Sequence, residues 1–265
     1  MESRNPVLNR EFATFRNGAP TAETLQGMYD APGSDGRVMT IDDVVVKTGM
    51  LFLILVVAAI GGWKLYDTTP AIVFISAIAA FVLGMFVAFK RTASPVLIMG
   101  YALLEGLFLG GISNFYQNSK YINPNQGNLV LQAVIGTFVA FGVMLLLYKS
   151  GRLRATPQFT KVMTIALVSY LGIAVVSLIS ALFGVGGGWG FYGVGPMGLL
   201  LCALGVGLAA FTLVLDFDAI EKGINAGLPE RESWRGAFGL MVTLVWLYLE
   251  LLRLLALLQG GGGRR

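Results

Sequence analysis

The sequence has no histidine and a single cysteine, and charged residues make up only 13% of its 265 residues. Without histidine there can be no histidine general base, Ser–His or Cys–His dyad, HExxH zinc site or histidine-ligated haem. Cys202 alone cannot form an internal disulfide or a CxxC site, and its place in an apolar run predicts a packing role. We therefore expect a protein that is not an enzyme and that carries no cofactor.

The shortage of charge also argues against a soluble protein, because soluble domains carry about 25% charged residues. Apolar residues make up 55% of the chain, and the mean hydropathy is +0.72. The basic residues are not interleaved with aromatic residues on a polar face, so nothing predicts a nucleic-acid partner. The first residues are polar and mixed in charge, unlike a cleavable signal peptide. This composition predicts a polytopic membrane protein.

Seven apolar stretches are each close to the roughly 20 residues that a helix needs to cross a bilayer. They predict an all-α bundle with spans at about 44–66, 71–89, 95–114, 128–148, 162–184, 197–221 and 238–258. A polar N-terminal tail (1–43) precedes this transmembrane domain (44–258), and a short C-terminal tail (259–265) follows it. Thr40 and Asp43 have the spacing of a capping box just before the first span.

The distribution of lysine and arginine predicts the orientation. Fourteen of these residues lie in the tail and the even-numbered loops, against four in the odd-numbered loops and the C-terminal tail. We expect a cytoplasmic N-terminus and, after seven spans, an external C-terminus.

Two pairs of small residues predict close contacts between helices. Gly106 and Gly110 form a GxxxG pair in the third span, and Ala203 and Gly207 form a similar pair in the sixth.

Ionisable residues inside spans cost about 2.5–3.5 kcal/mol each at a helix centre, so they are candidates for function. They are Glu105, Asp216, Asp218, Glu250 and Arg253. Residue counts from the expected span edges place Glu105, Asp216 and Glu250 in the cytoplasmic half. Structural interpretations remain open: an ion pair between Glu250 and Arg253, a helix anchor at Glu105 and a solvated carboxylate at Asp218.

If Asp216 and Glu250 meet, they would titrate as one coupled unit, which would be the obvious pH sensor in a chain without histidine. Two carboxylates facing a cytoplasmic cavity would also suit calcium transiently, since calcium prefers oxygen ligands.

Three sequence motifs resemble one known family. Residues 215–220 (LDFDAI) resemble the Asp-Thr-Gln-x-Ile ending of its sixth helix. Residues 246–250 (WLYLE) resemble the Leu-Tyr-Leu-Asp of its seventh, and residues 105–110 (EGLFLG) resemble a motif of its third. Over about 44–258, and outside the tail, the chain is similar to the bacterial branch of the Bax inhibitor-1, or transmembrane Bax inhibitor motif, family.

The resemblance implies a seven-helix bundle with the last helix central and a pH-sensitive calcium leak across a bacterial plasma membrane. It makes Asp216 and Glu250 the pH-sensing pair, with glutamate where the family has a second aspartate. It makes Arg91, or else Lys90, the latch that holds the pair. The loop before the seventh helix is longer than is usual in the family.

Two other functions remain open from the sequence. One is a regulator that binds a membrane protease or another integral membrane partner, for which an exposed small-residue helix face would be the sign. The other is an intramembrane aspartyl protease, but Asp216 follows Val214 and Leu215 rather than the Gly-x-Gly that such enzymes require.

Overall fold

The computed structural model describes residues 37–90, 92–118, 128–185, 190–193 and 195–260. The chain divides into two units, Met1–Val38 and Met39–Arg265. In the first unit only residues 37 and 38 are described, and every helix considered below belongs to the second.

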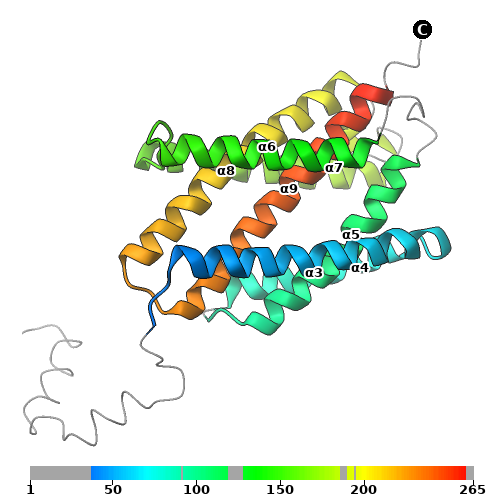
Figure 1. Ribbon diagram of the computed structural model, residues 1–265. Helices are drawn as coiled ribbons and strands as arrows, with labels where there is room; N and C mark the ends of the chain where they lie inside the picture. Colours follow the sequence, from blue (N-terminus) through cyan, green and yellow to red (C-terminus); the bar gives the residue numbers. More distant parts are fainter. Residues whose placement is uncertain (1–36, 91, 119–127, 186–189, 194, 261–265) are drawn as a thin grey trace, which may run out of the picture. The chain divides into compact units, whose positions relative to one another are not determined.

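The described residues of the second unit form an all-α bundle with seven helices long and apolar enough to cross a membrane (Figure 1). This confirms the predicted class, an integral membrane protein with seven spans. In chain order the helices are α3 (Ile41–Thr68), α4 (Ile72–Phe89), α5 (Pro95–Gln117), α6 (Leu129–Lys149), α7 (Pro157–Leu182), α8 (Pro196–Asn225) and α9 (Ser233–Gly260). Two short 3-10 turns, η3 (Gly190–Tyr192) and η4 (Glu230–Glu232), precede α8 and α9.

The helices match the predicted spans, but several extend further. Helix α7 begins at Pro157, five residues before the predicted edge, because Thr156 caps it and proline suits a first helical position. Helix α8 continues to Asn225 and ends in a Schellman motif, with Gly227 at φ +65° and the Leu228 N–H donating to the Gly223 carbonyl at 3.1 Å. Helix α9 begins at Ser233, also five residues earlier than expected.

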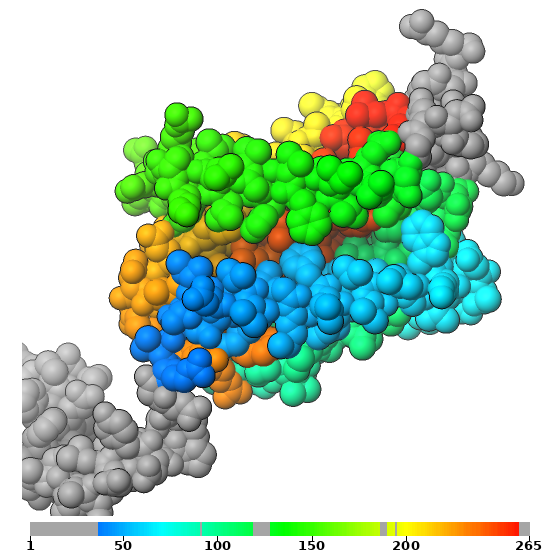
Figure 2. Space-filling view, in the orientation of Figure 1, coloured from blue at the N-terminus to red at the C-terminus, as the bar shows by residue number. Residues whose placement is uncertain are grey.

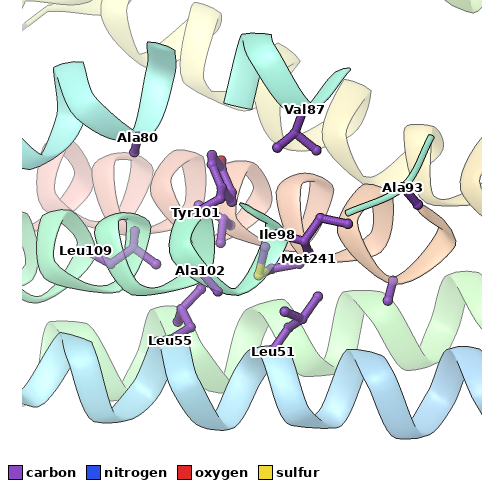
Figure 3. Packing of buried hydrophobic residues seen from close by; sticks show 12 residues of the cluster. Leu51, Leu55, Ala80, Val87, Ala93, Ile98, Tyr101, Ala102, Leu109 and Met241 are labelled. Atoms are coloured by element: carbon purple, nitrogen blue, oxygen red, sulfur yellow. The ribbon is translucent and has the colours of Figure 1, made fainter. Parts of the chain in front are cut away.

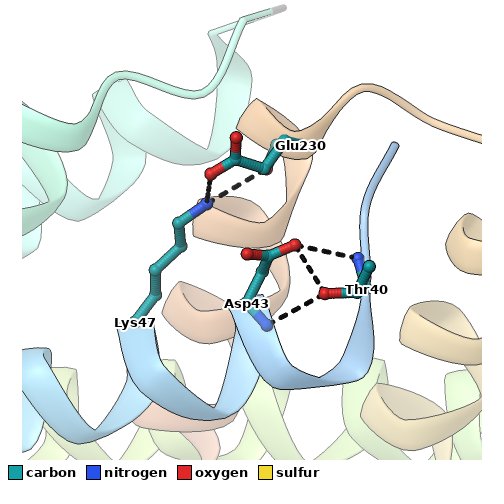
Figure 4. Close-up of polar contacts among 4 residues, drawn as sticks. All are labelled: Thr40, Asp43, Lys47 and Glu230. Carbon is teal, nitrogen blue, oxygen red and sulfur yellow. Dashed lines mark hydrogen bonds and ion pairs between the residues drawn. The ribbon is translucent and has the colours of Figure 1, made fainter. Parts of the chain in front are cut away.

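The start of α3 is fixed by the predicted capping box, which is confirmed (Figure 4). The Asp43 N–H donates to Thr40 Oγ1 at 3.2 Å, and the Thr40 N–H donates to Asp43 Oδ2 at 3.2 Å. Two backbone donors that the first turn leaves unsatisfied are thereby bonded.

Helix α9 is central, as predicted, because it contributes to three separate clusters of buried apolar residues. In one cluster Met241 of α9 packs with residues of α3, α4 and α5, among them Leu51, Ala80 and Ile98 (Figure 3). In a second, Leu240, Leu244 and Leu247 of α9 pack with α8 and Met144 of α6. Half of the residues in the most apolar 18-residue stretch of this helix are buried, against 17% in the corresponding stretches of α3, α4 and α7.

Helices α3 and α5 pack backbone to backbone through the predicted glycine pair. A Cβ on Gly106 would lie 2.7 Å from Ala58 Cβ, and one on Gly110 would lie 2.7 Å from the Trp63 nitrogen. Glycine is therefore required at both positions for this close approach.

Candidate functional site

Helices α8 and α9 each carry one carboxylate with a buried oxygen that lacks a hydrogen-bond partner among the described residues. These atoms are Asp216 Oδ2 and Glu250 Oε2. Leaving a buried charged acceptor unbonded is costly, so each oxygen calls for an explanation. The two carboxylates lie at different pockets, which are described in turn.

Asp216 lies at a pocket of about 140 Å³ between the end of α8 and the start of α9. The Thr243 hydroxyl hydrogen-bonds Asp216, and Gly239 of α9 faces Asp216 Oδ1. Glu232 and Arg235 also line the pocket and pair with each other at 2.7 Å. Asp216 therefore has one neutral hydrogen-bond donor and polar groups within its pocket.

The segment that leads into α3 closes part of this pocket. The Met39 N–H donates to the Leu228 carbonyl at 2.8 Å, and the Met39 side chain lines the pocket. Eight residues on, the largely buried Lys47 ammonium pairs with Glu230 Oε1 at 3.0 Å (Figure 4). Lys47 also lies 5.6 Å from the centre of the Trp234 ring. These contacts hold the start of α3 against the α8–α9 connection.

The connection between α4 and α5 is bound to the same end of the bundle. Arg231 Nε donates to the Ala93 carbonyl at 2.6 Å, and Arg235 donates to the Lys90 carbonyl at 3.3 Å. Arg235 also lines the Asp216 pocket, so this one side chain connects the pocket to the end of α4. The Lys90 ammonium itself lies 5.8 Å from the centre of the Phe86 ring. Arg91, the other predicted latch residue, lies outside the described residues.

Glu250 has a more elaborate environment. Glu250 Oε1 accepts hydrogen bonds from the Tyr170 hydroxyl of α7 at 2.7 Å and from Trp246 Nε1 at 3.0 Å. Arg253 lies close enough for its charge to act on Glu250. This Arg253 guanidinium donates to the Tyr192 carbonyl and lies 4.6 Å from the centre of the Tyr192 ring. All five residues line a pocket of about 440 Å³ beside α7.

Gly205 of α8 makes room for this network. A Cβ at Gly205 would lie 2.6 Å from Glu250 Cδ, and it would also overlap the Tyr170 hydroxyl. A glycine in mid-helix usually destabilises the helix by about 1 kcal/mol relative to alanine. Here the cost is offset by the space that the Glu250 side chain occupies.

The structure does not bring Asp216 and Glu250 together. Asp216 lies beside Gly239 and Thr243 of α9, and Thr243 precedes Glu250 by seven residues, about 10 Å along the helix. The two acids therefore lie at different levels of the bundle and have different neighbours. Glu250 lies near η3 and the α7–α8 connection. Because α9 begins at Ser233, five residues earlier than predicted, Glu250 lies further from the α8–α9 end than expected.

The remaining predicted acids have local partners. Glu105 is buried in α5 and accepts a hydrogen bond from Tyr101 one turn earlier, while Tyr101 packs against the Phe238 ring of α9. Asp218 forms an ion pair with Lys222 at 2.6 Å near the end of α8. The Glu105 hydrogen bond thus lies within α5 rather than between helices, and Asp218 is ion-paired rather than simply solvated.

Sequence reasoning missed several residues of these pockets. Tyr170 and Thr243 lie within apolar runs, and no spacing in the sequence ties either to an acid on another helix. Lys47 could have been found, since a lysine two turns into an apolar helix calls for an acidic partner. In the sequence, Lys47 is one of the fourteen basic residues that predict the orientation.

No cluster of three or more acidic or cysteine side chains that could hold a metal is present in the described ranges. A calcium ion at Glu250 would thus depend on that acid, and one at Asp216 on that acid and Glu232, together with hydroxyl, backbone or water oxygens. Such a small charge count gives weak and reversible binding.

The sequence model of one protein family, described as Bax inhibitor 1 like, matches residues 5–260. The chain belongs to this family. A search of curated proteins finds no match to the chain. The family match covers most of the polar tail, so the expectation that the resemblance ends near residue 44 was too narrow.

Proposed function

We propose that this Bax inhibitor 1 like protein is a pH-sensitive calcium leak channel in the plasma membrane of a bacterium, with its N-terminus in the cytoplasm. The permeating calcium ion would meet the carboxylates of Asp216 and Glu250 in succession along α9. No cofactor and no catalytic step is part of this function. Its partners would be calcium ions, protons and membrane lipid.

The observation that carries the proposal is the unsatisfied carboxylate oxygen at each of two pockets on one central helix. A hard cation prefers such oxygens, and the one or two acids at each pocket bind it weakly enough to release it. Asp216 is nearer the loop-lined end of the bundle, so it would be the first acid that a cation from that side meets.

Control by pH would come from the same acids, because a protonated carboxyl no longer attracts a cation. The charged or titratable groups facing Asp216 are Glu232 and Arg235. Those facing Glu250 are Tyr170, Tyr192 and Arg253. The absence of histidine leaves carboxylates as the groups that can exchange protons between mildly acidic and neutral pH.

Closure would depend on the basic end of α4. Arg91, with Lys90 as the second choice, would approach Asp216 in the closed state and withdraw in the open state. The hydrogen bond from Arg235 to the Lys90 carbonyl supports this assignment, because it ties the end of α4 to the Asp216 pocket. Arg91→Ala should raise the basal calcium leak, and unchanged flux in both Arg91→Ala and Lys90→Ala would contradict the latch.

The direct experiment is calcium flux into proteoliposomes that contain the full chain, measured with an entrapped indicator across a pH series. We expect flux above that of empty liposomes, and a pH dependence that Asp216→Asn or Glu250→Gln flattens. Flux equal to that of empty liposomes at every pH would contradict the channel function.

A second function is favoured by one observation on α8. Ala203 is exposed, and a Cβ on Gly207 would meet nothing within 4 Å, so this small-residue face is not used by the described helices. The Gly106–Gly110 pair, in contrast, is used inside the bundle. A helix of an integral membrane partner, such as a membrane protease, could pack there. Gly207→Leu should abolish co-purification of such a partner and leave calcium flux unchanged, whereas Gly172→Leu on α7 should affect neither.

A further inference from the structure

A furrow between α3 and α6 has no role in the proposed channel. Figure 2 shows α9 at the floor of this furrow, between the two helices. The furrow is a pocket of about 360 Å³ lined by α3, α5, α6 and α9, a volume typical of ligand sites, which span roughly 300–1,000 Å³.

The walls of the furrow suit an apolar chain rather than water or an ion. The polar side chains at its floor are bonded within the protein: Ser113 and Tyr248 share a hydrogen bond of 2.6 Å, and Thr137 donates to the Ala133 carbonyl at 2.8 Å. Val56 and Ile60 of α3 are both more than half exposed along its rim. In a membrane this rim faces lipid, so an acyl chain can enter from the side.

The length of the furrow matches one leaflet. Its α3 wall runs from Phe52 to Lys64, twelve residues or about 18 Å along the helix. One leaflet contributes half of a hydrocarbon core about 30 Å thick, or about 15 Å.

A single charge marks the end of the furrow. Lys64 is exposed and lines the pocket at the end nearest the α3–α4 connection. Among the described side chains no carboxylate forms an ion pair with it, and the nearby Asp67 instead accepts a hydrogen bond from Asn114 at 3.0 Å. An apolar slot one leaflet long with a lysine at its outer end is complementary to a lipid with an anionic headgroup.

We propose that this furrow binds one anionic phospholipid, with an acyl chain along α9 and the headgroup phosphate at Lys64. The bound chain fills the gap between α3 and α6, which the described residues leave open. This site is independent of the Asp216 and Glu250 pockets, so it stands whether or not the protein conducts calcium.

Native mass spectrometry of the full chain in detergent, titrated with phosphatidylglycerol or phosphatidylcholine, tests the proposal. The wild type should retain one phosphatidylglycerol in preference to phosphatidylcholine. Lys64→Gln should lower that preference about fivefold, the effect of one lysine near an anionic surface. Val56→Phe should narrow the furrow and remove the retained lipid, whereas Val57→Phe, at the exposed neighbouring position of α3, should keep it.

Both phenylalanine substitutions lie at exposed positions, so neither should prevent folding. Equal lipid retention in Val56→Phe and the wild type would overturn the site in the furrow. An unchanged preference in Lys64→Gln would overturn the headgroup contact. Adducts that increase without saturating, equally for both lipids, would identify the lipid as adventitious and would also overturn the proposal.

Discussion

The Asp216 pocket and the Glu250 pocket share helix α9 and differ in how completely the protein surrounds the acid. Asp216 has a single hydroxyl donor and lies at a small pocket whose other walls come from the loop-bearing end of the bundle. Glu250 receives a phenol and an indole donor, with an arginine close by and a glycine shaped to admit it.

This difference separates the two acids by role. A carboxylate held by donors from α7 and α9 has little freedom to rearrange around a passing ion, and it links those helices. Asp216, to which the described residues offer one neutral donor, retains its capacity to bind a cation. We therefore expect Asp216 to dominate cation flux and Glu250 to contribute more to the stability of the bundle.

The largest effect should come from Asp216→Asn. Two unit charges about 4 Å apart interact by about 4 kcal/mol at an effective dielectric constant near 20, and a divalent ion doubles this, so calcium flux should fall at least about tenfold. Glu250→Gln should lower flux less. Asp218→Asn is the matched control, because Asp218 already pairs with Lys222, and it should leave flux nearly unchanged in the same proteoliposome assay. A greater loss in Asp218→Asn than in Asp216→Asn would reverse the assignment.

The two glycines that face the two acids sharpen the comparison through stability. Gly205→Ala should lower the free energy of unfolding by about 1–3 kcal/mol, because the new Cβ overlaps Glu250 and Tyr170. Gly239→Ala should be tolerated, since its Cβ would lie 3.6 Å from Asp216 Oδ1, an ordinary contact. Thermal unfolding of the two purified variants in one detergent measures the difference. Equal destabilisation would show that the Glu250 pocket is not tightly packed.

The smallest effect should come from the ion pair that closes the Asp216 end. Lys47→Gln or Glu230→Gln should each destabilise the bundle modestly, with a coupling energy of about 1 kcal/mol between them in a double-mutant cycle. Since this pair holds α3 against the α8–α9 connection, each variant should also raise the basal leak. A coupling energy near zero would mean that the contact contributes nothing to closure.

The sequence was sufficient for features that depend on local chemistry. The seven spans follow from apolar length, and the start of α3 follows from Thr40 and Asp43. Gly106 and Gly110 predicted a close helix contact on α5, although not that its partner is α3. The polar environment of Glu250 could not be predicted from the sequence. Tyr170 and Gly205 belong to two other helices, and the packing of the bundle decides how each helix is rotated toward Glu250.

The start of α9 shows how a small local error alters a functional interpretation. Residues 233–237 are less apolar than the span that follows, so the pattern placed the helix edge at 238 instead of at Ser233. The earlier start adds five residues, about 8 Å along the helix, between Glu250 and the beginning of α9. The aspartate and the glutamate were thus paired by motif, whereas the fold assigns them different neighbours.

The central claim is that Asp216 and Glu250 act in separate pockets, and calcium flux through Asp216→Asn, Glu250→Gln and the double variant tests it most directly. Sites without shared partners have additive free energies, so the fold reductions of the two single variants should multiply in the double variant. A double variant no weaker than the Asp216→Asn variant alone would show that the two carboxylates act as one coupled unit, which would contradict the separation.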